Sequence, residues 1–178
     1  MRVTTGKYRG RKLIENKYEH IRPTADVVKQ AVFNKLAFVV PGSEILDLFC
    51  GTGALGIEGL SRGAESVVFA DKDPRSIALT KRNLDLLGIK ENYKIITGDY
   101  KNVIKMLSSK KFDVIILDPP YQSGVYEDAI QKIFENKLLK DDGVIVCEHN
   151  QKDSYDFSPF CVDCEKTYGI KKITYLKY

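Results

Sequence analysis

The stretch Asp47-Leu48-Phe49-Cys50-Gly51-Thr52-Gly53-Ala54-Leu55-Gly56 decides the fold of this chain. It follows an apolar run that begins at Glu44 and leads into a helix-like segment, and its three glycines fit the pattern G-x-G-x-x-G. Such a turn between a strand and a helix lets the backbone pass close to a ligand. The pattern alone is weak, because a tight glycine turn with Asp47 as a local cap has the same sequence.

Strand-like and helix-like segments alternate along the chain from this point. The expected strands are Glu44–Phe49, Ser66–Ala70, Asn92–Thr97, Phe112–Leu117 and Gly143–Glu148, and the expected helices are Gly53–Arg62, Pro74–Leu87, Tyr100–Leu107 and Tyr126–Phe134, after an earlier helix that opens at Thr24. Alternating elements of this kind give parallel strands joined by right-handed crossovers. Two further strand-like stretches, Tyr155–Val162 and Ile170–Leu176, have no helix between them and favour an antiparallel pair. We therefore expect an α/β fold, a Rossmann-like and doubly wound sheet of seven mostly parallel strands with an antiparallel C-terminal hairpin.

The composition is that of an ordinary globular protein. The chain has 178 residues, of which 43% are hydrophobic and 29% are charged, and this length suits one domain. No apolar run approaches the roughly 20 residues that span a bilayer, and residues 1–6 contain no apolar signal-peptide core. We expect a cytoplasmic protein with a single domain over 1–178, made of an N-terminal extension, 1–22, and a core, 23–178.

Cysteine and histidine supply no obvious metal site or nucleophile. Cys161 and Cys164 form a single C-x-x-C without a second pair or a nearby histidine, and a zinc site needs about four ligands. We therefore expect no metal, with a metal or redox role for this pair as the minor alternative. The two histidines, His20 and His149, have no evident serine or cysteine partner for nucleophilic catalysis.

The positive charge is concentrated at the N-terminus. Residues 1–22 contain seven basic and two acidic residues, whereas the whole chain carries only +4. A short hairpin with its turn around Tyr8-Arg9-Gly10 is expected here. Clustered cations with interleaved aromatic residues suit a nucleic acid, and the alternative is a solvated basic arm. The candidate RNA-binding residues are Lys7, Tyr8, Arg9, Arg11 and Lys12.

Acidic residues follow the first three expected strands. Asp47 stands just before the glycines, Asp71 ends the second strand, and Gly98-Asp99 follows the third. S-adenosylmethionine carries a cationic ammonium and a cationic sulfonium but no phosphate, so an acid at the glycine turn favours it over a dinucleotide. Asp71 suits ribose hydroxyls in either cofactor family. Asp99 either lies near adenine or caps the following helix, and Asp73 is expected to cap the helix that starts at Pro74.

A second motif, Asp118-Pro119-Pro120-Tyr121, follows the apolar run 112–117. Two prolines end a strand, because each lacks an N–H and fixes φ. The resulting stiff loop holds a carboxylate, a carbonyl and an aromatic ring at the carboxyl end of a strand, where ligands bind in open α/β sheets. These groups suit a planar base with an exocyclic amino group. The alternative is a strand-ending turn with a solvated Asp118.

Taken together, these motifs resemble those of class I S-adenosylmethionine-dependent methyltransferases that modify exocyclic amines. Four further stretches, Gly6–Leu13, Arg22-Pro23-Thr24, Ala31–Asn34 and Gly56–Ala64, resemble the RsmD family, which methylates N2 of one guanine in bacterial 16S ribosomal RNA. The resemblance extends nearly end to end, although Cys161–Glu165 matches no family pattern.

The resemblance implies S-adenosyl-L-methionine as cofactor and 16S ribosomal RNA as partner. Because a protein of this size has little surface for reading sequence, we expect it to act on a structured substrate, an assembled small ribosomal subunit. The resemblance implies that residues from several elements hold or border the cofactor, namely Asp47, Phe49, Gly51, Gly53, Asp71, Asp99, Arg22 and Thr24. It also implies a catalytic loop of Asp118, Pro119, Pro120 and Tyr121 and an N-terminal hairpin that contacts RNA.

Three alternatives stay open at this point. An adenine-N6 or guanine-N2 methyltransferase acting on DNA or another RNA has the same amine-binding loop. The glycine pattern also fits a nicotinamide-dependent oxidoreductase, and the basic arm fits a non-catalytic RNA-binding protein.

Overall fold

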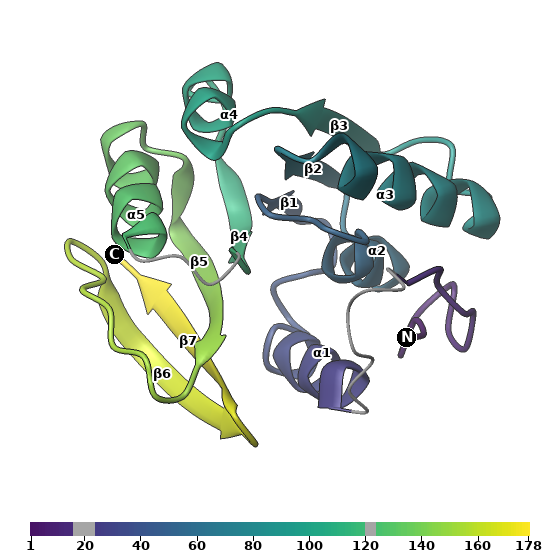
Figure 1. The fold of residues 1–178 in the computed structure, drawn as a ribbon, viewed down its shortest axis with the longest axis horizontal. Coiled ribbons are helices and arrows are strands. Elements are labelled where there is room, and N and C mark those ends of the chain that lie inside the picture. Colours follow the sequence, from purple (N-terminus) through teal and green to yellow (C-terminus); the bar gives the residue numbers. More distant parts are fainter. Residues whose placement is uncertain (16–23, 120–123) are drawn as a thin grey trace.

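The computed structural model of the chain describes residues 1–15, 24–119 and 124–178, and Figure 1 shows how they are arranged. The strands are β1 Glu44–Asp47, β2 Ser66–Asp71, β3 Tyr93–Thr97, β4 Phe112–Leu117, β5 Leu139–Asn150, β6 Cys161–Tyr168 and β7 Lys171–Lys177. The helices are α1 Thr24–Lys35, α2 Ala54–Ser61, α3 Pro74–Leu87, α4 Tyr100–Met106 and α5 Val125–Glu135.

These strands form one sheet in the order β3-β2-β1-β4-β5-β7-β6. Strands β1 to β5 pair in parallel, whereas β7 lies antiparallel between β5 and β6. The expected seven-stranded, mostly parallel sheet with an antiparallel C-terminal hairpin is confirmed. The strand order reverses between β1 and β4, and ligands of open α/β sheets bind at such a reversal, beyond the carboxyl ends of the strands.

Helices cover both faces of the sheet (Figure 1). Buried side chains of α1, α2 and α3 form one apolar core with Ile45 and Phe69. Those of α4 and α5 form a second core with Leu46 and Ile115. Ile45 and Leu46 are adjacent in β1 and enter different cores, because successive side chains of a strand point to opposite faces. Burial on both faces explains why the strands read as apolar runs in the sequence.

Two glycines bring α2 close to the sheet. A Cβ built on Gly56 would lie 2.3 Å from Cε1 of Phe69, and one built on Gly59 would lie 2.7 Å from Cδ1 of Ile45. The backbone of α2 therefore packs directly on the side chains of β1 and β2. The last glycine of the G-x-G-x-x-G pattern serves this contact between helix and sheet.

The bounds of α3 and β4 are those expected from the sequence. The Asp73 side chain caps α3 by accepting from the Arg75 N–H at 2.8 Å, and Pro74 occupies the first helical position. Gly88 ends the helix with φ +70°, in the left-handed region that glycine tolerates best.

The expected strand Tyr155–Val162 is wrong, because β6 begins only at Cys161. Phe157 and Phe160 belong to a loop and are buried in the core that α5 covers. Most side chains of β6 are exposed, so this edge strand lacks the apolar alternation from which a strand is predicted. Strand β5 is also longer than expected and extends to Asn150.

The N-terminal residues form a small hairpin. Arg2 and Lys12 form an isolated antiparallel bridge. The Val3 N–H donates to the Arg11 carbonyl at 3.0 Å, and the Gly10 N–H donates to the Val3 carbonyl at 2.8 Å. The predicted hairpin is therefore present over residues 1–13, and residues 16–22 of the extension lie outside the described chain. Within the described residues, no helix combines the length and the apolar character needed to cross a membrane.

Candidate active site

Three expected acids meet at the carboxyl edge of the sheet. Asp47 ends β1, Asp71 ends β2, and Asp118 directly follows β4, which pairs with β1 through Asp47 and Ile116. Asp47 is 2% exposed, and burial raises its pKa to about 7. A hydrogen bond from the Gly56 N–H (3.0 Å) opposes this rise, whereas the charges of Asp118 and Asp71 add to it. A cationic ligand would relieve this mutual repulsion.

The glycine turn combines open space with tight packing. Gly51 has φ +52°, and a Cβ built on it would meet no atom within 4 Å. Gly53 precedes α2 with φ +76°, and a Cβ there would lie 2.8 Å from Cγ2 of Thr80. Gly51 therefore leaves room for a ligand against the backbone, whereas Gly53 is required by the turn and by its contact with α3.

Asp71 also holds the glycine turn in place. Its Oδ2 accepts from the Gly51 N–H at 3.0 Å, and its Oδ1 accepts from the Asp73 N–H at 2.9 Å. The Gly98 N–H donates to the Asp71 carbonyl at 2.9 Å, which ties the end of β3 to the end of β2. The sequence predicted a ligand-binding role for Asp71 but not this structural one.

Two further predicted cofactor-binding residues, Asp99 and Phe49, lie beyond β3 and β1. Asp99 is exposed and caps α4 by accepting from the Lys101 N–H at 3.0 Å, which is the capping role considered from the sequence. Phe49 is half-buried, and its ring lies 5.6 Å from that of Tyr100. These contacts leave Asp99 and the Phe49–Tyr100 pair at the same edge of the sheet as Asp71.

Parts of the predicted site lie outside the described residues. Asp118 is exposed and Pro119 is buried, but Pro120, Tyr121 and Arg22 fall in the ranges that the structure does not describe. Thr24 is the first residue of α1, and its side chain is likewise outside the description.

The predicted RNA-binding residues are carried by the hairpin. Lys7, Arg9, Arg11 and Lys12 are exposed, and Tyr8 is half-buried. Arg11 donates to the Leu86 carbonyl of α3 at 3.0 Å, which fixes one of these cations on the protein surface.

A buried ion network that the sequence analysis missed holds this hairpin on α2. Glu58 is fully buried and accepts from the Thr4 N–H at 2.9 Å and from the Thr5 N–H at 3.1 Å. Arg62 Nε donates to Glu58 at 2.9 Å, and the buried Lys29 ammonium lies 3.8 Å from it. The signal in the sequence was an acid within the apolar stretch of α2.

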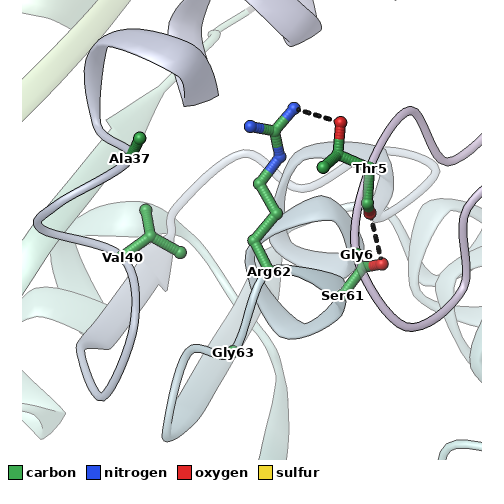
Figure 2. A pocket seen from close by; sticks show the side chains of 7 residues that line it. All are labelled: Thr5, Gly6, Ala37, Val40, Ser61, Arg62 and Gly63. Carbon is green, nitrogen blue, oxygen red and sulfur yellow. Dashed lines mark hydrogen bonds between the residues drawn. The ribbon is translucent and has the colours of Figure 1, made fainter.

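A second set of contacts fixes the hairpin at the C-terminal end of α2. Ser61 Oγ donates to the Thr5 carbonyl at 2.6 Å, and the Lys7 N–H donates to the Ser61 carbonyl at 2.8 Å. Figure 2 shows the pocket beside these contacts, which is lined by Thr5, Gly6, Ala37, Val40, Ser61, Arg62 and Gly63. This pocket lies at the end of α2 opposite the glycine turn, so it is not the predicted cofactor site.

Asn83 of α3 joins the hairpin to the glycine turn. Its side chain donates to the carbonyls of Ile14 (3.0 Å) and Thr52 (2.9 Å) and accepts from the Ile14 N–H at 2.7 Å. The stretch Gly56–Ala64 and Asn83 thus give the basic hairpin a fixed position relative to the cofactor turn.

Replacing Glu58 with glutamine is expected to lower the free energy of unfolding by about 3 kcal/mol, because it removes the buried carboxylate that pairs with Arg62 and leaves the buried Lys29 ammonium with Asp26, at 3.3 Å, in place of two acidic neighbours. Lys29 is 2% exposed and Arg62 side-chain exposure is 9%. Chemical denaturation monitored by circular dichroism measures the change. The exposed Glu91→Gln is the matched control, and a loss below about 0.5 kcal/mol for Glu58→Gln, the size of an ordinary surface substitution, would contradict this role.

The reversed strand order, the antiparallel C-terminal pair and the acids at the glycine turn define a class I methyltransferase fold. The chain belongs to the family described as Conserved hypothetical protein 95, whose family model matches residues 1–177.

Two similar proteins are named as rRNA methyltransferases, one of them provisionally. Ribosomal RNA small subunit methyltransferase D of Haemophilus influenzae is 37% identical over 174 residues, covering 96% of this chain and 90% of that protein. YlbH of Bacillus subtilis, provisionally named an rRNA methyltransferase, is 33% identical over 181 residues, covering 99% of this chain and 98% of that protein.

Solved structures agree in fold. The Escherichia coli protein yhhF, provisionally described as a methyltransferase, superposes with a TM-score of 0.88 at 28% identity and covers 99% of this chain and 97% of its own. SMU.776, solved in complex with SAH, has a TM-score of 0.70 at 18% identity, covering 84% of this chain and 49% of its own, so it supports the fold alone.

Proposed function

We propose that this protein is an rRNA methyltransferase that uses S-adenosyl-L-methionine to methylate the exocyclic N2 amine of a guanine in 16S ribosomal RNA. The observation that carries the proposal is the position of Asp118, which follows β4 at the strand reversal, next to the buried Asp47 of β1. The two named relatives are an rRNA methyltransferase of the small subunit and a provisional rRNA methyltransferase. The proposal treats residues 1–178 as one domain.

The residues at the glycine turn fit the proposed cofactor. Asp47 places negative charge where the ammonium and sulfonium cations need it, and a dinucleotide pyrophosphate would be repelled there. The open space at Gly51 allows close approach to the backbone. Asp71 and Asp99 have carboxylate lone pairs available for hydroxyl or amino groups beyond those used in their backbone hydrogen bonds. When bound, S-adenosylmethionine supplies a methyl group on a good leaving group.

Asp118 and Pro119 orient the acceptor amine in this proposal. The Asp118 carboxylate and the Pro119 carbonyl accept the two N–H groups of guanine N2, which aims the nitrogen lone pair and stabilises the positive charge that develops on it. The methylated nitrogen then loses one proton, which passes to the Asp118 carboxylate and from there to water. Tyr121 stacks on the base, a contact worth about 1–3 kcal/mol. The base leaves its own stack to reach this loop.

The basic hairpin binds the RNA away from the reacting base. Its turn is held beside Ser61, at the far end of α2 from the glycine turn. Phosphate contacts from Lys7, Arg9 and Lys12 would therefore position the RNA without reading its sequence. A structured substrate, such as an assembled small subunit, supplies groups at both places.

The test is to incubate the protein with S-adenosylmethionine carrying a labelled methyl group and with small ribosomal subunits from cells that lack the protein. We expect label at N2 of one guanine of 16S ribosomal RNA, identified by nuclease mapping and mass spectrometry. Label on an adenine, on DNA or on large-subunit RNA would show that the proposed target is wrong but that the protein is a methyltransferase. Hydride exchange with a nicotinamide, with no methyl transfer, would overturn the class itself.

A further inference from the structure

A second pocket lies beyond the end of β5, the strand next to β4, and the proposed reaction does not use it. Strand β4 ends at Leu117, which pairs with Cys147 of β5. Strand β5 continues to Asn150 and pairs there with the start of β7 at Lys171. The sheet thus extends beyond Leu117, on the side of Asp118 opposite the glycine turn.

This extension, the following loop and the β6 residues Val162 and Glu165 line a partly open pocket of about 320 Å³. Its lining includes His149, Gln151, Lys152, Tyr155, Phe157 and Lys172. The volume is near the lower end of ligand pockets, which span about 300–1,000 Å³. The pocket therefore has room for one small planar group.

The aromatic wall of this pocket is held in place by hydrogen bonds. His149 Nδ1 lies 3.0 Å from the Asn150 carbonyl, and Nε2 lies 2.9 Å from Oγ1 of Thr174. The rings of Tyr155 and Phe157 lie 5.3 Å and 6.0 Å from the His149 ring. His149 is buried and Tyr155 is half-buried, and both line the pocket.

The pocket is physically linked to the end of β4. Tyr126, in the first turn of α5, hydrogen-bonds through its hydroxyl to the Glu148 carbonyl and lies with its ring 4.6 Å from that of Tyr155. The same hydroxyl lies 3.5 Å from the Leu117 carbonyl, immediately before Asp118. Tyr126 thus contacts both the aromatic wall, through Tyr155, and the end of β4, which leads into the proposed base-binding residues Asp118 and Pro119.

The charges of the pocket are nearly balanced. Lys172 pairs with Glu165 at 3.3 Å, and Tyr155 donates to the Asp153 carboxylate at 3.2 Å. Lys152 is exposed at the rim. An uncharged base with its phosphate outside, near Lys152, fits this distribution better than a phosphate within the pocket.

We propose that this pocket binds the base of a nucleotide next to the target guanine, stacked on the wall that contains Tyr155, with Lys152 beside its phosphate. The inference rests on the proposed function. Extruding the target base removes its stacking contact with the neighbouring base. Stacking of that neighbouring base on an aromatic side chain replaces the lost contact. The pocket thereby selects for RNA in which the target is flanked by an unpaired nucleotide.

The test measures methyl transfer to small subunits by Tyr155→Leu, Tyr155→Phe and Lys152→Ala. Tyr155→Leu is expected to raise KM for the subunit about tenfold, the size of one lost base stack, with kcat and cofactor affinity unchanged. Tyr155→Phe keeps the ring and should match the parent, and Lys152→Ala should raise KM several-fold. Phe38→Ala is the matched control, because Phe38 is a fully exposed aromatic residue in the turn before β1, at the opposite edge of the sheet.

If Tyr155→Leu folds and its KM for the subunit equals that of the parent, the pocket does not bind the neighbouring base. The proposed methyltransferase function would be unaffected by that result. If Tyr155→Leu does not fold, photocrosslinking of the parent protein to subunits that contain 4-thiouridine decides. Crosslinks within residues 151–157 are expected, and their absence would overturn the proposal. If the parent protein transfers no methyl group at all, the proposed function has failed, and the crosslinks separately report whether RNA reaches the pocket.

Discussion

Replacing Asp118 with alanine is expected to lower kcat for methyl transfer about a hundredfold or more while affinity for S-adenosylmethionine changes little. The carboxylate is exposed at the end of β4, next to the end of β1. In the proposed mechanism it accepts an N–H of the target amine and stabilises the charge that develops on nitrogen. Single-turnover assays with small subunits, together with calorimetric titration of the cofactor, separate these two effects.

Two further variants sharpen this test. Asp118→Asn keeps an acceptor oxygen and loses the charge, so its kcat should lie between those of the parent and Asp118→Ala. Glu65→Ala removes another exposed carboxylate, just before β2 at the opposite edge of the sheet, and should leave kcat unchanged. Parental kcat for Asp118→Ala would exclude the proposed catalytic role.

Replacing Asp47 with asparagine is expected to weaken S-adenosylmethionine binding about tenfold or more, because it removes a buried charge from the proposed cation site. Asparagine is nearly isosteric, and its carbonyl oxygen can still accept from the Gly56 N–H, as Asp47 does at 3.0 Å. The glycine turn should therefore keep its shape. Calorimetric titration measures the change, and an unaltered dissociation constant would show that Asp47 does not face the cofactor.

The pH dependence of cofactor binding, compared between the parent and Asp47→Asn, tests the role of Asp47 as well. The pKa of Asp47 is raised to about 7 by burial, with Asp118 and Asp71 adding to the rise. Cation binding favours the ionised carboxylate, so the parent should bind the cofactor more tightly as pH increases through about 7. Asp47→Asn should lose this part of the pH dependence.

Protein stability should change in the opposite sense. Because the folded pKa of Asp47 lies above its unfolded value of 3.8, its contribution to stability is fully present below that value and is lost as pH rises through about 7. Without cofactor, Asp47→Asn should therefore be more stable than the parent at about pH 8.5, with a smaller difference at about pH 5. Equal differences at both values would contradict a raised pKa for Asp47.

Local sequence patterns were sufficient for most of the fold. The bounds of α3 follow from its Asp73 cap and the Gly88 stop, which are interactions between close neighbours in the chain. Strand β4 follows from its apolar run and the prolines after it. The start of β6 was not predictable in this way, because an exposed edge strand has no apolar face and the buried Phe157 and Phe160 lie in a loop.

The features of the candidate site likewise fall into those that local sequence predicts and those that only the structure shows. Sequence alone determined that acids follow the first two strands and β4, because strand ends and glycine turns are local features. Only the tertiary structure decided that Gly56 packs against Phe69, that Glu58 anchors the basic hairpin, and that β5 carries an aromatic pocket beyond the end of β4. Each of these depends on contacts between residues far apart in the chain. The order of the strands in the sheet and the burial of side chains between sheet and helices bring these residues together, and no local sequence pattern predicts such contacts.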